Sequence, residues 1–538
     1  MSFMSRAIPV LRIARRAGSA VAARRDRRDR RGVGKAVLRS MFVAPDPGRL
    51  RLRFATRAVL GISLAVTLCA LVGHTLVAAI IAGLAALLAL FTVTDTTVRG
   101  QAVTTALLPA VGFPVLALAA LLHDYPVLRD LAFLAVMGAG VYARRWGPRG
   151  HSLGVFAFMT FFAAQFLHTE LPQLPSLYEA ITIALLASST VRFGLWCYER
   201  RLPPATVPAL AARRGLARAT TRQAVQATLG GGVALVIGHA LSGDRWYWAI
   251  GATWWIFVNT VSRGETLVRG FRRVLGTLIG IAVGVVVVLP LHGALVPTAV
   301  IVAVCVFGIF YTAAVSYTWM MLAVTVMAGG LYGLLGVLDP GLLALRLLET
   351  GAGALGAVLA VLLVLPVTTH ATTNAWIERA VRTVHACTRE AAARLSGSAT
   401  ADPAPHIADL EVILGRVRLS LAPLVHPLSP LRARRVRARQ VIALLDECAD
   451  QVRSLTAIAT DPVASCDDRL AAACARVEAA VEALIASEEA LTAPAAPAAV
   501  KHAGALEPAL AHLHGLERAL LELATPVRSS PRTPLIGA

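Results

Sequence analysis

A succession of apolar runs, separated by short polar joints, fills the sequence between Ala55 and Pro366. A transmembrane helix needs about 20 mostly apolar residues to cross about 30 Å of hydrocarbon. Charged residues make up 15% of the chain, whereas soluble proteins average about 25%. The pattern therefore predicts an all-α membrane protein with twelve spans. The predicted spans are residues 55–73, 76–93, 102–122, 127–143, 152–168, 176–197, 219–239, 245–261, 273–290, 295–311, 318–338 and 343–365.

Arginine residues, which carry most of the positive charge of this chain, are concentrated in every second joint between apolar runs. The net charge of the chain is +21. Arg-bearing joints follow every second run, apart from an uncharged joint near Ser316. The positive-inside rule then predicts a multi-pass protein of the cell inner (plasma) membrane with both termini cytoplasmic. Aromatic residues are not interleaved with the basic clusters, so we expect no nucleic-acid partner. The expected partners are the lipid bilayer and a second copy of the chain in a homo-oligomer.

The first six runs match the second six at a nearly constant spacing. Thr56 corresponds to Thr221 at an offset of 165, and residues 95–100 correspond to residues 265–270 at an offset of 170. Each half has an even number of spans, so the two halves lie parallel in the membrane. The sequence therefore predicts two parallel six-helix transmembrane repeats followed by a cytoplasmic helical bundle.

Composition divides the chain into six parts. The C-terminal part lacks apolar spans, so we expect its bundle to support assembly rather than permeation. The predicted parts are an Arg-rich cytoplasmic N-terminal arm (1–54), the first transmembrane repeat (55–197), a linker (198–217), the second transmembrane repeat (218–366), a cytoplasmic helical domain (367–525) and a disordered tail (526–538).

No familiar enzyme or metal motif occurs in the sequence. It has no Walker loop, no H-E-x-x-H and no G-x-S-x-G. The seven Cys do not form two C-x-x-C pairs at metal-site spacing, and we interpret them as small buried hydrophobes in a reducing compartment. We therefore expect no enzymatic activity, no cofactor and no metal site.

An acidic residue in the last predicted span is a candidate for proton coupling. Charged groups at bilayer depth cost at least ~2.5–3.5 kcal/mol each, so they usually face a partner or a pathway. Arg346 and Glu349 lie one helical turn apart and can neutralise each other. One interpretation is a structural ion pair. The other is a proton-coupling site of Glu349 with Arg346, which Glu179 repeats at the offset of 170.

Five further residues are candidates for substrate binding. Arg57 and Arg222 begin equivalent spans near the predicted cytoplasmic face, where they either anchor the topology or attract an anion. Trp254 and Trp255 lie deep enough in their span to stack on an aromatic solute. Asn259, one turn beyond Trp255, is an intramembrane amide suited to helix–helix bonding or to ligand contact.

Two stretches of the second half resemble a known family signature. They are Arg245-Trp-Tyr-Trp-Ala-Ile-Gly-Ala-Thr and the segment from Arg263 to Gly280. This pattern is similar to the fusaric acid resistance protein-like (FUSC) family, aromatic acid exporter group. The resemblance implies efflux of aromatic carboxylic acids driven by an ion gradient. A helix-packing motif within the second stretch consists of Arg273, Gly276, Thr277 and Gly280.

Three functions are compatible with the sequence. The first is an inner-membrane efflux transporter for aromatic carboxylic acids or similar amphipathic organic anions, driven by the proton gradient. The inside-negative membrane potential favours the exit of an anion by ~2.3 kcal/mol per charge per 100 mV. The second is a passive anion channel, which shares these features. The third is a non-transport envelope-assembly or scaffold protein whose C-terminal bundle recruits partners.

The Arg asymmetry makes a testable prediction about topology. In a variant that lacks the seven native Cys, we expect a Cys at Ser398 to resist an impermeant maleimide in intact cells and to react after permeabilisation. A Cys at Ser242, in a joint on the predicted outer side, should react in intact cells. Labelling at position 398 from outside would contradict the predicted topology.

Overall fold

The computed structural model describes residues 49–95, 97–199, 218–258, 260, 263–365, 369–395, 398, 400–425, 432–459, 468–485 and 507–528. Among these residues the chain forms α-helices and short 3₁₀ helices, with no strand. Several of the helices are long and apolar enough to cross a membrane. The predicted all-α membrane fold is therefore confirmed.

In the N-terminal part of the described chain, one α-helix corresponds to each predicted span. The side chains of Thr75, Thr97 and Asp339 accept a hydrogen bond from the backbone N–H three residues further on, which caps three of these helices. The helices are α2 (Leu50–Leu71), α3 (Leu76–Thr92), α4 (Val98–Leu121), α5 (Pro126–Ala143), α6 (Gly147–Phe166), α7 (Leu174–Glu199), α8 (Ala219–Leu241), α9 (Tyr247–Phe257), α10 (Arg263–Val287), α11 (Leu295–Thr312), α12 (Tyr317–Leu334) and α13 (Pro340–Leu363).

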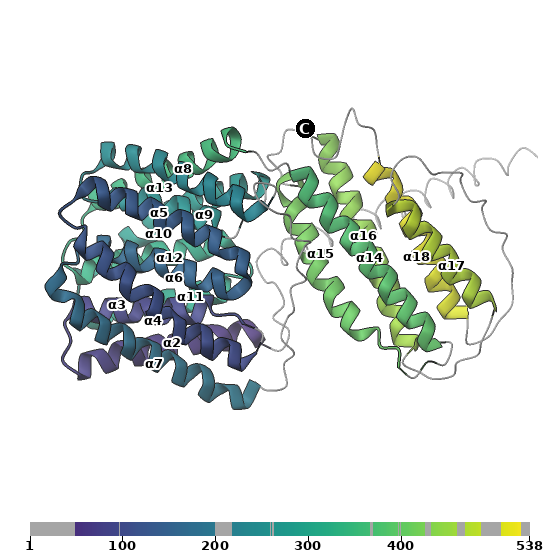
Figure 1. The fold of residues 1–538 in the computed structure, drawn as a ribbon, viewed down its shortest axis with the longest axis horizontal. Helices are drawn as coiled ribbons and strands as arrows, with labels where there is room; N and C mark the ends of the chain where they lie inside the picture. Colours follow the sequence, from purple (N-terminus) through teal and green to yellow (C-terminus); the bar gives the residue numbers. More distant parts are fainter. Residues whose placement is uncertain are drawn as a thin grey trace, which may run out of the picture.

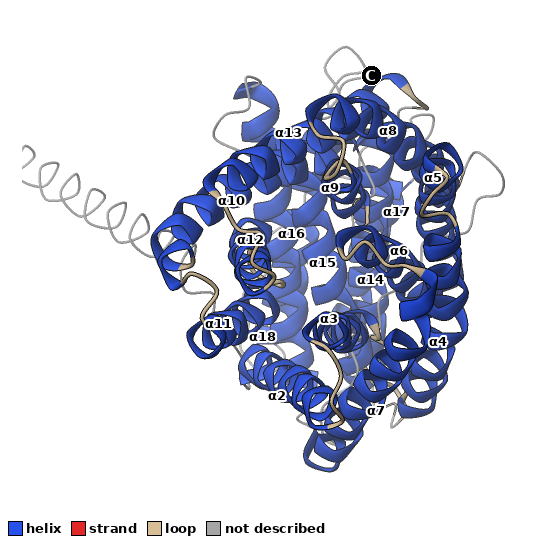
Figure 2. Ribbon diagram, turned by 90° about the vertical axis from the view of Figure 1, so that its left-hand side faces the viewer, coloured by secondary structure: helices blue, strands red, loops and turns tan. Residues whose placement is uncertain are grey.

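These helices form an inner group and an outer ring. Seen end-on, α3, α6, α9 and α12 lie inside the ring of the other membrane helices (Figure 2). The ring helices expose large apolar side chains, as a surface in contact with lipid does. Examples from five ring helices are Leu60, Leu131, Val236, Val286 and Val304.

Nine stretches of the described residues are long and apolar enough to cross a membrane. One of them, Pro126–Phe166, contains both α5 and α6 and the 3₁₀ helix η2 (Arg144–Trp146) between them. α3 is apolar but has only 17 residues. The length and composition of these stretches make the chain a multi-pass membrane protein.

α9 is shorter than the sequence predicted. Its 11 residues end at Phe257, so the helix is about 16 Å long, roughly half of the hydrocarbon thickness. The prediction of a full-length helix over residues 245–261 is therefore wrong. The helix can end early because protein surrounds it: all of its residues except Trp248 and Trp255 are buried. Irregular backbone is tolerated at membrane depth where protein covers it.

Each half of the membrane part has the same pattern of helix neighbours. α2 packs on α3 and α7, and α8 packs on α9 and α13. α6 packs on α4 and α5, and α12 packs on α10 and α11. The halves join through α5 with α8 and through α11 with α2. These pairs correspond one to one, as two related halves would require.

The C-terminal helices form a second hydrophobic core. They are α14 (Thr369–Leu395), α15 (Ala404–Val425), α16 (Arg432–Ala459), α17 (Asp468–Ile485) and α18 (Glu507–Arg528). The bundle lies beside one end of the membrane helices, where α15 packs on α10 (Figure 1). We call this end of the membrane helices the bundle side and the opposite end the far side. Burial raises the pKa of the free thiols of Cys387 and Cys448 to about 12.

Three helices extend past the predicted boundaries between parts of the chain. α2 begins at Leu50, within the predicted arm, and α7 ends at Glu199, within the predicted linker. α18 continues to Arg528, within the predicted tail. The remainder of the arm, linker and tail lies outside the described residues.

Close packing of α10 on α12 depends on glycine. A Cβ atom at Gly276 would lie 2.6 Å from the backbone oxygen of Thr318, whereas one at Gly284 would have no heavy atom within 4 Å. We expect Gly276→Ala to lower the free energy of unfolding by about 1–3 kcal/mol, because the backbone of α12 must move. Gly284→Ala should be neutral or slightly stabilising, since Ala favours a helix over Gly. Equal melting temperatures of the two purified variants in detergent would contradict this packing.

Candidate functional site

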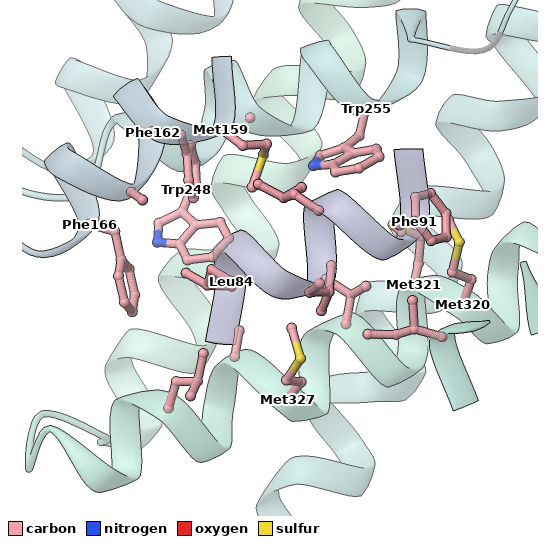
Figure 3. A pocket seen from close by; sticks show the side chains of 18 of the residues that line it. Leu84, Phe91, Met159, Phe162, Phe166, Trp248, Trp255, Met320, Met321 and Met327 are labelled. Carbon is pink, nitrogen blue, oxygen red and sulfur yellow. The ribbon is translucent and has the colours of Figure 1, made fainter. Parts of the chain in front are cut away.

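A cavity of about 110 Å³, which we call the central cavity, lies between the four inner helices, α10 and α11 (Figure 3). Side chains from α3, α6, α9 and α12 surround it. Its lining residues are Leu84, Leu87, Leu88, Phe91, Met159, Phe162, Ala163, Phe166, Trp248, Gly251, Trp255, Arg273, Ile309, Met320, Met321, Val324, Met327, Ala328 and Leu331.

Methionine and aromatic side chains make much of this wall. The labelled side chains in Figure 3 include Met320, Met321 and Met327 from α12 and Trp248 and Trp255 from α9. A thioether is flexible and polarisable, and sulfur makes favourable contacts with rings. Aromatic side chains offer faces and edges for stacking. The central cavity is therefore suited to aromatic solutes of somewhat different shapes.

Arg273 is the one charged residue among those that line the central cavity. Its side chain is buried, with 5% of its surface exposed. One terminal nitrogen donates to the hydroxyl of Tyr317 at 3.4 Å and to the sulfur of Met321 at 3.0 Å, while Nε has no hydrogen-bond partner. A buried cation is destabilised when one of its N–H donors has no acceptor, as at Nε of Arg273. A carboxylate in the cavity would supply the missing acceptor.

A larger space of about 430 Å³, which we call the vestibule, lies on the bundle side. Its lining includes backbone and side chains of α9, α10, α12 and α15. Four cations and one acid give this lining a net charge of +3, which favours anions. The charged lining residues are Arg144, Arg269, Arg272, Arg416 and Glu265.

The early end of α9 holds two of these cations in place. A terminal nitrogen of Arg144 donates to the carbonyl oxygen of Phe257 at 3.2 Å, and Nε of Arg269 donates to that of Trp255 at 3.1 Å. The hydroxyl of Tyr317 also donates to Trp255, at 3.3 Å. The last carbonyls of a helix lack partners within it and carry partial negative charge, so they attract cations. The carbonyl groups at the end of α9 thus hold the side chains of Arg144 and Arg269 at the vestibule.

The vestibule and the central cavity share part of their lining. Phe91, Trp255 and Met320 belong to both. A solute in the vestibule therefore meets the same Trp255 ring that forms a wall of the central cavity. The two spaces are arranged in series, with the basic one on the bundle side.

A third space of about 280 Å³ continues from the central cavity, and we call it the far groove. The two share Leu84, Leu87, Met327 and Leu331. α2, α3, α11 and α12 line the far groove, which includes the residues at the far-side ends of α3, α11 and α12. Those end residues are Leu76, Leu295 and Leu334.

Aromatic side chains fill the corresponding region at the other junction between the halves, between α5, α6, α8 and α9. The rings of Phe158 and Trp254 stack with centroids 4.2 Å apart. Phe133 stacks on Phe158 and on Phe161, and Trp246 meets Phe133 edge-on. The open groove therefore lies at one junction between the halves, and a packed aromatic cluster occupies the other junction.

Glu349 lies in the core of the membrane part, fully buried on α13. Neither of its carboxyl oxygens has a hydrogen-bond partner, and no ion pair joins it to Arg346 within 4.0 Å. Instead the guanidinium of Arg346 lies 3.7 Å from the centre of the Trp248 ring. The structure therefore does not form the direct ion pair that was one of the two interpretations of these residues. The spacing of Arg346 and Glu349 allowed an ion pair, but the Arg346 side chain makes a cation–π contact with Trp248 on α9 instead.

The environment of Glu179 differs from that of Glu349. The Glu179 side chain is 67% exposed and lies 3.7 Å from Nε2 of His74. Glu179 sits on α7, a helix of the outer ring. The two acids share a position in the predicted repeat, but only Glu349 of this pair is buried.

The structure separates the five predicted substrate-binding residues. Trp255 lines both the vestibule and the central cavity, whereas Trp254 is fully buried in the aromatic cluster. Arg57 and Arg222 are half-buried near the first turns of α2 and α8 and line neither space. Asn259 lies outside the described residues.

Residues of the predicted helix-packing motif divide between two positions. Gly276 and Gly280 face α12, where added Cβ atoms would approach Thr318 and Thr325 closely. Thr277 is buried on the same helix. Arg273 extends into the wall of the central cavity. Sequence reasoning assigned it only to packing, although a conspicuous Arg next to a small-residue motif marks a possible polar position inside the bundle.

Sequence reasoning also missed the vestibule Arg residues and the methionines. Arg144, Arg269 and Arg272 served only as markers of topology. The pair Met320-Met321 lay within an apolar run, where nothing distinguishes a cavity wall from a lipid-facing surface. The sequence signal for the methionines is their number on α12.

Comparison with known families identifies the second half. Residues 233–360 match the family model described as fusaric acid resistance protein-like. This part of the chain is therefore similar to that family. The match runs from within α8 to within α13 and so includes Arg269, Arg273, Met321 and Glu349. No curated protein and no solved structure matches the chain. The match to this family and the apolar helices together indicate a membrane transporter.

The vestibule makes a prediction about anion binding. We expect Arg272→Gln to weaken the binding of 2-naphthoate to the purified protein in nanodiscs about three- to tenfold, because it removes one charge from the lining. Arg222→Gln removes the same charge from a site that lines neither space and should leave affinity within twofold. Equal affinities of the two variants, measured by equilibrium dialysis, would contradict the assignment of the vestibule as an anion site.

Proposed function

We propose that this protein exports aromatic carboxylates and similar amphipathic organic anions across the inner membrane, driven by the proton gradient. The observation that carries the proposal is the series of a basic vestibule and a Met-rich aromatic cavity with Arg273 in its wall. The vestibule collects anions, the rings and thioethers receive the apolar body, and Arg273 is placed to receive the carboxylate. This assignment agrees with the aromatic acid exporter group that the sequence resembles.

The order of the three spaces supports export rather than uptake. The Arg-rich joints place the vestibule in the cytoplasm under the positive-inside rule. An anion then passes from the vestibule through the central cavity to the far groove and out. The membrane potential favours this direction by ~2.3 kcal/mol per charge per 100 mV.

Glu349 is the proposed proton-coupling residue. Its carboxyl is fully buried and has no hydrogen-bond partner to hold it in one protonation state. Intramembrane acids of this kind commonly relay protons in transporters. Arg346 and Trp248 connect it to the central cavity, because Arg346 lies over the Trp248 ring and Trp248 lines the cavity. A substrate that moves Trp248 would change the electrostatic surroundings of Glu349.

The proposed parallel repeats give the transporter two related halves around the central cavity. The matching helix neighbours support this relation. The far groove at one junction between the halves is open, and its aromatic counterpart at the other junction is closed. Transporters of this kind move one repeat against the other around a fixed site.

A passive anion channel shares the basic entrance and the apolar path, and the scaffold function shares the C-terminal bundle. Transport measurements separate the three. A channel carries anions without a proton gradient, a coupled exporter requires the gradient, and a scaffold carries none.

The test uses inside-out membrane vesicles that contain the full chain, with 2-naphthoate as substrate and 2-naphthylmethanol as its neutral counterpart. We expect proton-gradient-dependent uptake of 2-naphthoate that a protonophore abolishes. Glu349→Gln should reach the membrane at normal levels and reduce gradient-driven uptake at least tenfold. Glu179→Gln, the same change in the exposed acid of the other half, should transport like the wild type.

Each alternative has its own outcome in this assay. Uptake that persists after the gradient is collapsed identifies a channel. Gradient-driven uptake by Glu349→Gln at every pH would remove Glu349 from coupling and reduce it to a structural residue. An absence of 2-naphthoate transport by the wild type would overturn the proposed function.

A further inference from the structure

The C-terminal bundle reaches over the vestibule. α15 packs on α10, and its residues Arg416 and Leu419 line the vestibule together with Arg144. Leu419 is a large apolar side chain with 45% of its surface exposed. One wall of the space in front of the central cavity therefore comes from the bundle, beyond the membrane helices.

Arg416 occupies an electrostatically unfavourable place. It lies near enough to Arg144 for the two cations to repel each other, and Glu265 is the one acid in the vestibule lining. Among the described residues, Arg416 has no hydrogen-bond or ion-pair partner. Two residues along the same helix, Arg418 pairs with Asp446 at 2.6 Å. A cation without a partner that faces another cation across a cavity creates a site for an anion.

We propose that α15 forms a wall of the substrate entrance and that Arg416 selects anionic aromatic substrates there. This inference rests on the proposed export function. Arg416 supplies charge, and Leu419 beside it supplies apolar surface for the ring. The pair repeats, at the entrance, the combination of Arg273 with the apolar wall of the central cavity. The bundle then contributes to permeation, in contrast to the assembly role that its lack of apolar spans suggested.

The role of Arg416 predicts a specific kinetic pattern. A residue that attracts substrate to the entrance affects the concentration dependence of transport more than the maximal rate. Arg416 should therefore change KM and leave Vmax nearly unchanged. Because its effect depends on charge, transport or binding of a neutral aromatic compound should not respond to it.

The experiment compares Arg416→Gln with Arg418→Gln in the full chain. Each variant loses one positive charge from α15, but only Arg416 lines the vestibule. The protein is placed in phosphatidylcholine nanodiscs for equilibrium binding of 2-naphthoate and in phosphatidylcholine liposomes for transport. These lipids carry no net charge, so an anionic headgroup cannot occupy the vestibule in place of the probe.

We expect Arg416→Gln to weaken 2-naphthoate binding and to raise KM by about three- to tenfold, with Vmax within twofold of the wild type. Arg416→Lys should restore affinity, Arg416→Glu should weaken it further, and Arg418→Gln should match the wild type. Binding of 2-naphthylmethanol should be the same in all variants. Melting temperatures of the purified variants establish that each is folded.

Two results would overturn the inference. One is equal 2-naphthoate affinity of Arg416→Gln and Arg418→Gln. The other is a loss of Vmax at unchanged KM, which would assign Arg416 to the structure of the bundle. The binding arm separates this inference from the proposed function: a wild-type protein that binds 2-naphthoate but does not transport it refutes export, while the comparison of variants still decides the role of Arg416.

Discussion

Backbone carbonyl groups at the end of α9 need hydrogen-bond donors, because hydrocarbon offers none. Arg144, Arg269 and Tyr317 supply these donors to Phe257 and Trp255. Since the carbonyls belong to an inner helix, the two cations are held at the mouth of the central cavity and away from lipid. The end of the short helix thereby holds two of the four vestibule cations, and its Trp255 lies between the vestibule and the cavity.

The membrane part combines matched helix neighbours with unequal cavities. α2, α3, α11 and α12 enclose the far groove, while α5, α6, α8 and α9 enclose the cluster around Phe158 and Trp254. Large rings at one junction between the halves and smaller aliphatic side chains at the other account for this difference. The same helix arrangement therefore holds an open groove at one junction and a packed core at the other.

The helices were predictable from the sequence because the thickness of hydrocarbon fixes the length of apolar runs. α9 departed from the prediction because its surroundings are protein. The 3-residue spacing of Arg346 and Glu349 allowed an ion pair, but in the structure the guanidinium of Arg346 lies over the Trp248 ring instead. The vestibule was not predictable from the sequence. Arg144, Arg269 and Arg416 are far apart along the chain, and only the packing of three separate helices brings them together.

We propose that the vestibule, central cavity and far groove form one path for aromatic anions. Met327 lies where the cavity meets the groove, and Ala157 lies 170 residues earlier at the equivalent place on α6, with the same exposed fraction of 8%. The most direct measurement is the rate at which an anionic methanethiosulfonate modifies a Cys at each position in a variant without native Cys. We expect the methanethiosulfonate to modify Met327→Cys, 2-naphthoate to slow this modification, and Ala157→Cys to remain unmodified. Equal reactivity at both positions, or no protection of Met327→Cys by 2-naphthoate, would contradict it.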